Sequence, residues 1–134
     1  MRFHHLGVMF CASLLLLVAC DRGTPPAAAT IPEGAKLAKV VFIGQLDVCD
    51  CTARSIDESY AALEAALGNP PKVPIERLEL DANPKEVEPY QKDKAIMALP
   101  AVFFVDEAGK ILSSVQGPQT KEQFEATLGG ALLD

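Results

Sequence analysis

A short apolar run behind a proline constrains the fold of this chain more than any other sequence feature. Residues 101–105 (AVFFV) are all apolar, in a run that is too short for a helix and has no polar alternation. Such a run predicts a strand that is buried on both faces of a sheet. Because proline has no N–H to donate to a strand ladder, Pro100 belongs at the start of this strand. The Leu99–Pro100 bond is also of the kind that adopts the cis form at modest cost.

Turn and cap signals organise the chain after this strand. Gly109 provides a turn, and a return strand is expected over 111–115. Thr120 and Gln123 have the spacing of a helix cap, so a last helix is expected to follow them.

Periodicity also predicts alternating strands and helices before the proline. A β-branched apolar strand is expected at 37–44 and a helix at 52–67. Residues 73–80 alternate apolar with mostly charged side chains, Glu79 among them, which predicts a strand with one exposed face. A further helix, capped by Asn83, is expected to run to about residue 96. The predicted order is β-α-β-α-β-β-α, an α/β domain over 37–134.

The first residues of the chain have the pattern of an export signal. Arg2 precedes an uncharged apolar stretch of 14 residues, 6–19, which is shorter than the ~20 residues needed to span a bilayer. This stretch ends in Leu-Val-Ala-Cys, which resembles the bacterial lipobox, whose cysteine carries lipid and begins the mature protein. We therefore expect a signal peptide over 1–19 and lipidation of Cys20. The alternative is an ordinary signal peptide with a chance cysteine.

The stretch 20–36 is rich in Pro, Ala and Thr and has no apolar period, so it is expected to be a flexible, lipid-anchored tether. The membrane is then a partner through the anchor, in a bacterial cell envelope with the domain facing the periplasm. A net charge of −6 with no basic cluster argues against a nucleic-acid partner.

Two of the four cysteines remain for chemistry in the domain. Cys11 lies inside the signal peptide and Cys20 is the lipidation candidate, which leaves Cys49 and Cys51. Residues at i and i+2 in a turn can bring their Cα atoms within the roughly 4.4–6.8 Å that a disulfide needs. A helix start near Thr52 would lower the pKa of a neighbouring thiol.

The element order, the stretch Asp-Ala-Asn-Pro at 81–84 and Leu-Pro at 99–100 resemble the thioredoxin-like fold family. The resemblance implies a four-stranded mixed sheet flanked by helices. It also implies that the bond before Pro100 is cis and lies against redox-active cysteines. The chain departs from the family at Cys49-Asp50-Cys51, where the family has Cys-x-x-Cys, and at Val41, where the family has a buried acidic residue.

Three functions fit the cysteine pair. The first, which we expect, is that of a membrane-tethered thiol–disulfide oxidoreductase outside the cytoplasm, monomeric and without a cofactor, that acts on protein thiols or disulfides. Its catalytic candidates are Cys49, Cys51 and Pro100. By exposure, Cys49 is expected to attack and Cys51 to resolve, although Cys51 is nearer the predicted helix start. The second is a non-enzymatic module that binds or delivers a soft metal (Cu, Zn or Hg) through the same thiolates. The third is a structural disulfide.

Overall fold

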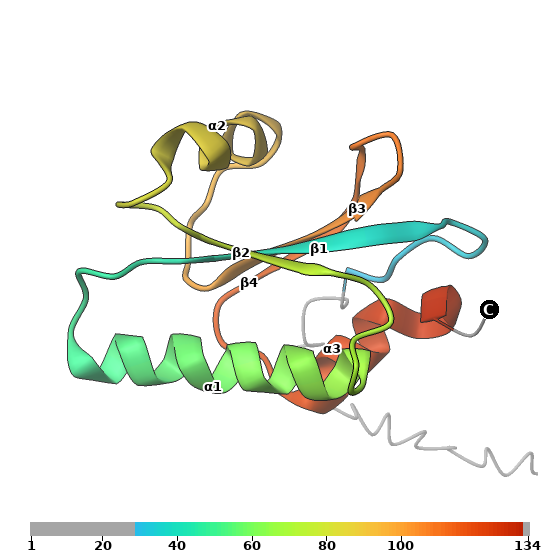
Figure 1. Ribbon diagram of the computed structural model, residues 1–134, viewed down its shortest axis with the longest axis horizontal. Helices are drawn as coiled ribbons and strands as arrows, with labels where there is room; N and C mark the ends of the chain where they lie inside the picture. The colour runs from blue at the N-terminus through green and yellow to red at the C-terminus, as the bar shows by residue number, and fades with distance from the viewer. Residues whose placement is uncertain (1–28, 133–134) are drawn as a thin grey trace, which may run out of the picture.

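The computed structural model describes residues 29–132 and has a four-stranded sheet with helices on both faces (Figure 1). Helices α1 and α3 cover one face and α2 covers the other (Figure 1). In chain order the elements are β1 (Leu37–Gly44), α1 (Asp50–Leu67), β2 (Ile75–Glu79), α2 (Pro84–Asp93), β3 (Ala101–Asp106), β4 (Ile111–Gln116), α3 (Lys121–Leu128) and a 3₁₀ turn η1 (Gly129–Leu132). This order confirms the predicted α/β architecture.

The pairing of the strands brings several loops to one end of the sheet. The strand order is β2-β1-β3-β4, with β1 parallel to β2 and β3 antiparallel to both of its neighbours. Ala101 pairs with Ile43 of β1 and with Gln116 of β4. The carboxyl ends of β1, β2 and β4 therefore lie beside the start of β3. We call this the cysteine end of the sheet: residues 45–49, Asp81, residues 95–100 and Gln116.

The core consists of two apolar layers, one on each face of the sheet. Successive residues of β1 point to opposite faces, so that Phe42 packs in the layer under α1 and α3 and Ile43 in the layer under α2. Phe104 and Phe103 of β3 divide in the same way. All of residues 101–105 are buried, which confirms the prediction of a strand covered on both faces.

Several predicted boundaries differ from those in the structure. Helix α1 begins at Asp50 rather than at residue 52, because Cys49 has the extended backbone of an N-cap and its carbonyl already accepts the N–H of Ala53 at 2.9 Å. Strand β2 is shorter than predicted, and α2 ends at Asp93 rather than near residue 96. The predicted cap of α3 is confirmed: Thr120 and Gln123 form a reciprocal capping box.

The described chain makes contact with the domain before β1. Ile31 is buried in the layer under α3, and its N–H donates to the carbonyl of Thr127 at 2.9 Å. Contacts with the domain thus begin inside the stretch 20–36 that the sequence predicts as a tether. The predicted signal peptide, 1–19, and Cys20 lie outside the described residues. Over residues 29–132, none of the helices combines the length and the apolar character needed to cross a bilayer.

Candidate active site

Cys49 and Cys51 lie together where the loop after β1 enters α1. Cys49 is the N-cap of the helix and Cys51 is its second residue. Both thiols are free and exposed, and their sulfur atoms are 2.7 Å apart. This separation is within about 1 Å of the S–S bond length of a disulfide. The two sulfur atoms are therefore close enough to react with each other.

The surroundings of Cys49 favour its thiolate. Hydrogen bonding to the Cys51 thiol, and next to the Thr52 hydroxyl 3.2 Å away, lowers the pKa of Cys49 to about 7 from an ordinary 9.0. The backbone N–H groups of Thr52 and Cys51, at the start of α1, lower the pKa of Cys49 further. A thiol with this pKa is substantially ionised at neutral pH, which is the form that attacks disulfides. From the sequence, Cys51 was expected to lie nearer the helix start than Cys49. In the structure, Cys49 is the N-cap of α1.

A side chain from the neighbouring strand holds the loop that leads to Cys49. The carboxylate of Asp81, just beyond β2, accepts the N–H of Asp47 at 2.8 Å and that of Leu46 at 3.1 Å. These bonds, the one from Asp47 first, hold the pKa of Asp81 below its ordinary value. Sequence reasoning did not identify Asp81 as a site residue, because the contact depends on β2 pairing with β1.

The loop before Pro100 is held in the same manner from β4. The side-chain oxygen of Gln116 accepts the N–H of Met97 at 2.6 Å and that of Ala98 at 3.1 Å, and its amide donates to the carbonyl of Ala95 at 2.8 Å. Gln116 was also not identified from the sequence. The Gln116 side chain thus provides hydrogen-bond partners for three backbone groups of residues 95–98, which belong to no helix or strand.

Pro100 is buried at the start of β3, and the bond before it is cis, as the resemblance implied. Because Ile43 pairs with Ala101, Pro100 lies beside the end of β1, where the loop to Cys49 begins. The structure therefore brings the three catalytic candidates, Cys49, Cys51 and Pro100, to the same end of the domain. Direct packing of Pro100 on the sulfur atoms stays a prediction.

No protein-family profile matches this chain, and no curated protein matches it. Among solved structures, one described as thioredoxin-2, a component of the malaria parasite protein secretion machinery, matches with a TM-score of 0.50 and 14% sequence identity. The match covers 73% of this chain and 89% of that one.

The chain has a thioredoxin-like fold. At 14% identity the likeness extends to the fold alone, so the chemistry of the chain has to be argued from its own residues. Within this thioredoxin-like fold, Cys49 and Cys51 lie at the junction of β1 and α1, at the end of the sheet that also holds Pro100.

Val41 occupies the strand position at which the thioredoxin-like family has a buried acidic residue, and it is buried and apolar. A different acidic residue is buried near the junction of β1 and α1. Glu79 ends β2 and is only 9% exposed, which corrects the prediction that it lies on an exposed face. One of its oxygens accepts from Nε of Arg77 at 2.9 Å, and the other has no hydrogen-bond partner among the described residues. Gly44 leaves the room that this carboxylate fills, since a Cβ there would lie 2.6 Å from Oε2 of Glu79.

The same end of this thioredoxin-like domain offers few further metal ligands. In the stretch 29–132, no group of three or more His, Cys, Asp or Glu side chains is placed to hold a metal ion. A metal would therefore depend on the two thiolates of Cys49 and Cys51 and on ligands of another kind.

Proposed function

We propose that this chain is a thiol–disulfide oxidoreductase in which Cys49 and Cys51 alternate between a dithiol and an intramolecular disulfide. The observation that carries the proposal is the 2.7 Å separation of two exposed sulfur atoms at the start of α1. The lowered pKa of Cys49 and the thioredoxin-like fold support it.

The proposed reaction proceeds in two exchange steps. The Cys49 thiolate attacks one sulfur of a substrate disulfide, so that the substrate S–S bond breaks and its second sulfur leaves as a thiolate that takes a proton from water. The Cys51 thiol then gives its proton to water and attacks the Cys49 sulfur, which releases the other substrate sulfur as a thiolate. Two electrons pass to the substrate as the Cys49–Cys51 bond forms. The reverse sequence oxidises a pair of substrate thiols.

Side chains around the site hold the loops that carry the reacting residues. Asp81 fixes the loop before Cys49 and Gln116 fixes the loop before Pro100, so the nucleophile is presented from a defined backbone. Both cysteines are exposed, so exposure does not distinguish them. We assign attack to Cys49 and resolution to Cys51 because the hydrogen bonds around Cys49 lower the pKa of its thiol.

We further propose that the domain acts outside the cytoplasm, tethered to a bacterial membrane by lipid on Cys20. The support is the sequence of an apolar stretch that ends in Leu-Val-Ala-Cys and is followed by a Pro- and Ala-rich segment. Its substrates are then protein thiols or disulfides of the cell envelope.

Trapping of mixed disulfides tests the proposed function. A Cys51→Ser chain lacks the resolving thiol and should accumulate disulfide-linked partner proteins through Cys49, visible on non-reducing gels and released by dithiothreitol. A Cys49→Ser chain is the matched control and should trap few. The reverse pattern would exchange the two roles, and no trapping by either variant would contradict the proposed function.

A further inference from the structure

Two large apolar side chains are exposed in the part of the chain that the structure describes, and both lie at the cysteine end. Leu46 is 65% exposed and Met97 is 85% exposed. Leu46 comes three residues before Cys49, and Met97 comes three residues before Pro100. A single exposed leucine needs no explanation, but exposed apolar side chains that gather around one site indicate a binding surface.

The backbone N–H of each of these two residues donates a hydrogen bond to a side chain of another element. The N–H of Leu46 donates to the carboxylate of Asp81 at 3.1 Å, and the N–H of Met97 donates to Gln116 at 2.6 Å. An apolar side chain on a fixed backbone loses less conformational entropy when a partner covers it. The two loops are thus ordered in advance for contact.

The strand order places the loops of Leu46 and Met97 at neighbouring strands. Leu46 follows β1 and Met97 precedes β3, and Ile43 of β1 pairs with Ala101 of β3 in the middle of the sheet. Asp81 beyond β2 and Gln116 at the end of β4 hold the two loops from the outer strands. The loop that carries Leu46 is the one that ends at Cys49.

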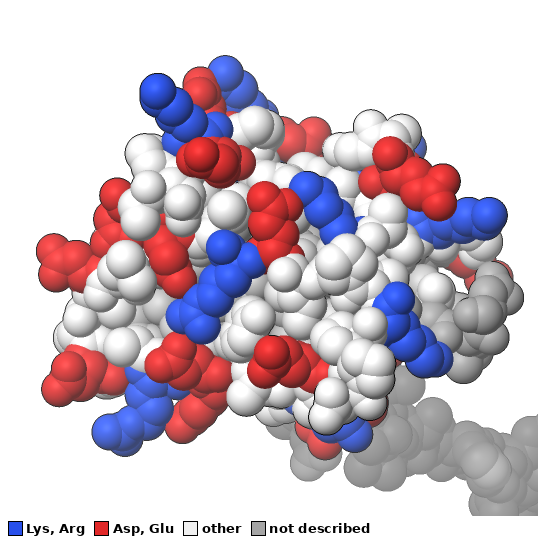
Figure 2. Space-filling view, viewed as in Figure 1, with Lys and Arg blue, Asp and Glu red and all other residues white. Residues whose placement is uncertain are grey.

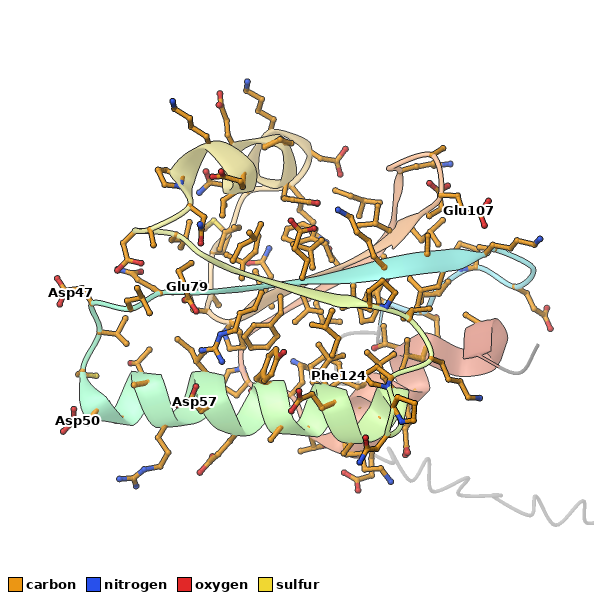
Figure 3. The ribbon with its side chains drawn as sticks, viewed as in Figure 1. Asp47, Asp50, Asp57, Glu79, Glu107 and Phe124 are labelled. Carbon is orange, nitrogen blue, oxygen red and sulfur yellow. The ribbon has the colours of Figure 1, made fainter. Side chains whose placement is uncertain are left out.

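The charges next to the cysteines identify the kind of partner. The charged side chains next to the cysteines in the sequence are Asp47, Asp50 and Arg54, and all three are exposed, so acidic groups outnumber the one cation. Figure 3 shows Asp47 and Asp50 at the end of the molecule where α1 begins, and Figure 2 shows mostly acidic side chains along that end, with a cationic one among them. Like charges disfavour a second copy of this chain, of net charge −6, and an anionic lipid surface at this site.

We propose that Leu46 and Met97 bind an extended segment of a partner protein whose reacting cysteine is flanked by apolar and cationic residues. This proposal rests on the proposed redox function and adds its substrate class. The apolar residues of the segment cover Leu46 and Met97, and its Lys or Arg side chains face Asp47 and Asp50.

Exchange rates with three short peptides test this substrate class. Each peptide carries one cysteine disulfide-linked to thionitrobenzoate, and its neighbours are Leu and Lys, Leu and Glu, or Ser and Lys. Attack by Cys49 of the reduced full chain joins Cys49 to the peptide cysteine and releases the coloured thionitrobenzoate anion. We expect the Leu–Lys peptide to react about tenfold faster than the Leu–Glu peptide at low salt, with the ratio approaching one at high salt. Loss of the leucine should slow the reaction severalfold.

Substitutions in the chain test whether the peptide preference arises from Asp47, Leu46 and Met97. Asp47→Asn should lower the Lys-to-Glu rate ratio, whereas Glu107→Gln should leave it unchanged. Glu107 makes the matched charge control because it lies at the opposite end of the molecule (Figure 3). Leu46→Ser and Met97→Ser should each lower the Leu-to-Ser ratio. Equal rates for all three peptides would overturn the proposed partner while leaving the redox function in place.

A binding measurement keeps the two proposals separable. A peptide with Leu and Lys around an alanine in place of cysteine should shift the backbone amide resonances of Leu46 and Met97 in the full chain. If no disulfide of any kind reacts, the redox function is overturned and these shifts still decide the partner. Shifts confined to other residues, or a dimer that Leu46→Ser disperses, would overturn the proposed partner.

Discussion

The carboxylate of Asp81 accepts the backbone N–H of Asp47 at 2.8 Å, so a residue beyond β2 positions the loop that ends at Cys49. The loop itself belongs to no helix or strand, and the strand ladder ends at Gly44. The positions of the two thiols therefore depend on a side chain that is more than 30 residues further along the chain.

Replacing Asp81 should loosen this loop. Asn retains one oxygen acceptor and Ala retains none, so amide hydrogen exchange at Leu46 and Asp47 should become faster in Asp81→Asn and faster still in Asp81→Ala. Because both N–H groups lose their charged acceptor, the exchange rates in the Ala variant should rise severalfold. Unchanged exchange at both amides would contradict this assignment. Because the pKa of Asp81 is lowered in the folded chain, its stabilising effect is complete above the ordinary carboxyl pKa and is lost only as the pH falls through the lower folded value.

The reactivity of Cys49 should follow a pKa of about 7. Below that pH the alkylation rate should fall about tenfold per unit, because only the thiolate reacts, and above it the rate should level off. Thr52→Val removes one of the hydrogen bonds that favour the thiolate and should move the midpoint upward. Alkylation with iodoacetamide, followed by mass spectrometry of the peptide that carries Cys49, measures the midpoint in the unsubstituted chain and in Thr52→Val. A midpoint near the ordinary thiol value in the unsubstituted chain would contradict the described surroundings of this sulfur.

The contact between Gly44 and Glu79 predicts a non-additive pair of substitutions. In Gly44→Ala the new methyl would lie 2.6 Å from Oε2 of Glu79 and 3.2 Å from the Ile56 side chain, so the buried carboxylate of Glu79 has to move. The free energy of unfolding should fall by about 1–3 kcal/mol, the usual cost of overpacking. In a Glu79→Ala background the same substitution should cost less, because the carboxylate is gone. Denaturant unfolding of the four chains measures the coupling, and strictly additive effects would contradict the close approach.

The lipid anchor is tested by a single substitution at Cys20. In a bacterial host, the exported chain should sediment with membranes, and Cys20→Ser should release it to the soluble fraction because the acyl chains are lost. Cell fractionation, with detection by an antibody to the domain, measures how much of each chain is in the membrane and soluble fractions. A Cys20→Ser chain that is exported and still bound to membranes would contradict the anchor.

The features that the sequence predicted correctly are those whose causes are local. The buried strand at 101–105 is visible as an unbroken apolar run, and the cap of α3 as Thr120 and Gln123 at the correct spacing. The cysteine pair is visible because it follows one predicted strand and precedes one predicted helix.

The features that the sequence did not predict depend on which strands become neighbours. Asp81 and Gln116 hold loops from strands that are far away in the sequence. Glu79 has the spacing of an exposed residue, yet Gly44 on the adjacent strand leaves space into which its carboxylate turns. Asn83 occupies the predicted N-cap of α2, but its side-chain oxygen accepts the N–H of Glu79 at 3.0 Å instead of capping the helix.

A redox titration shows whether Cys49 and Cys51 form a reversible disulfide. The full chain is equilibrated with mixtures of reduced and oxidised dithiothreitol, free thiols are alkylated, and the mass of the peptide that carries Cys49 and Cys51 is measured. We expect one two-electron transition in which both thiols become unreactive together and the peptide loses two hydrogens, with no such transition in Cys49→Ser. The contradicting result is a pair that stays fully alkylated in every mixture, above all in a chain that binds Cu(I) stoichiometrically and exchanges with no protein disulfide.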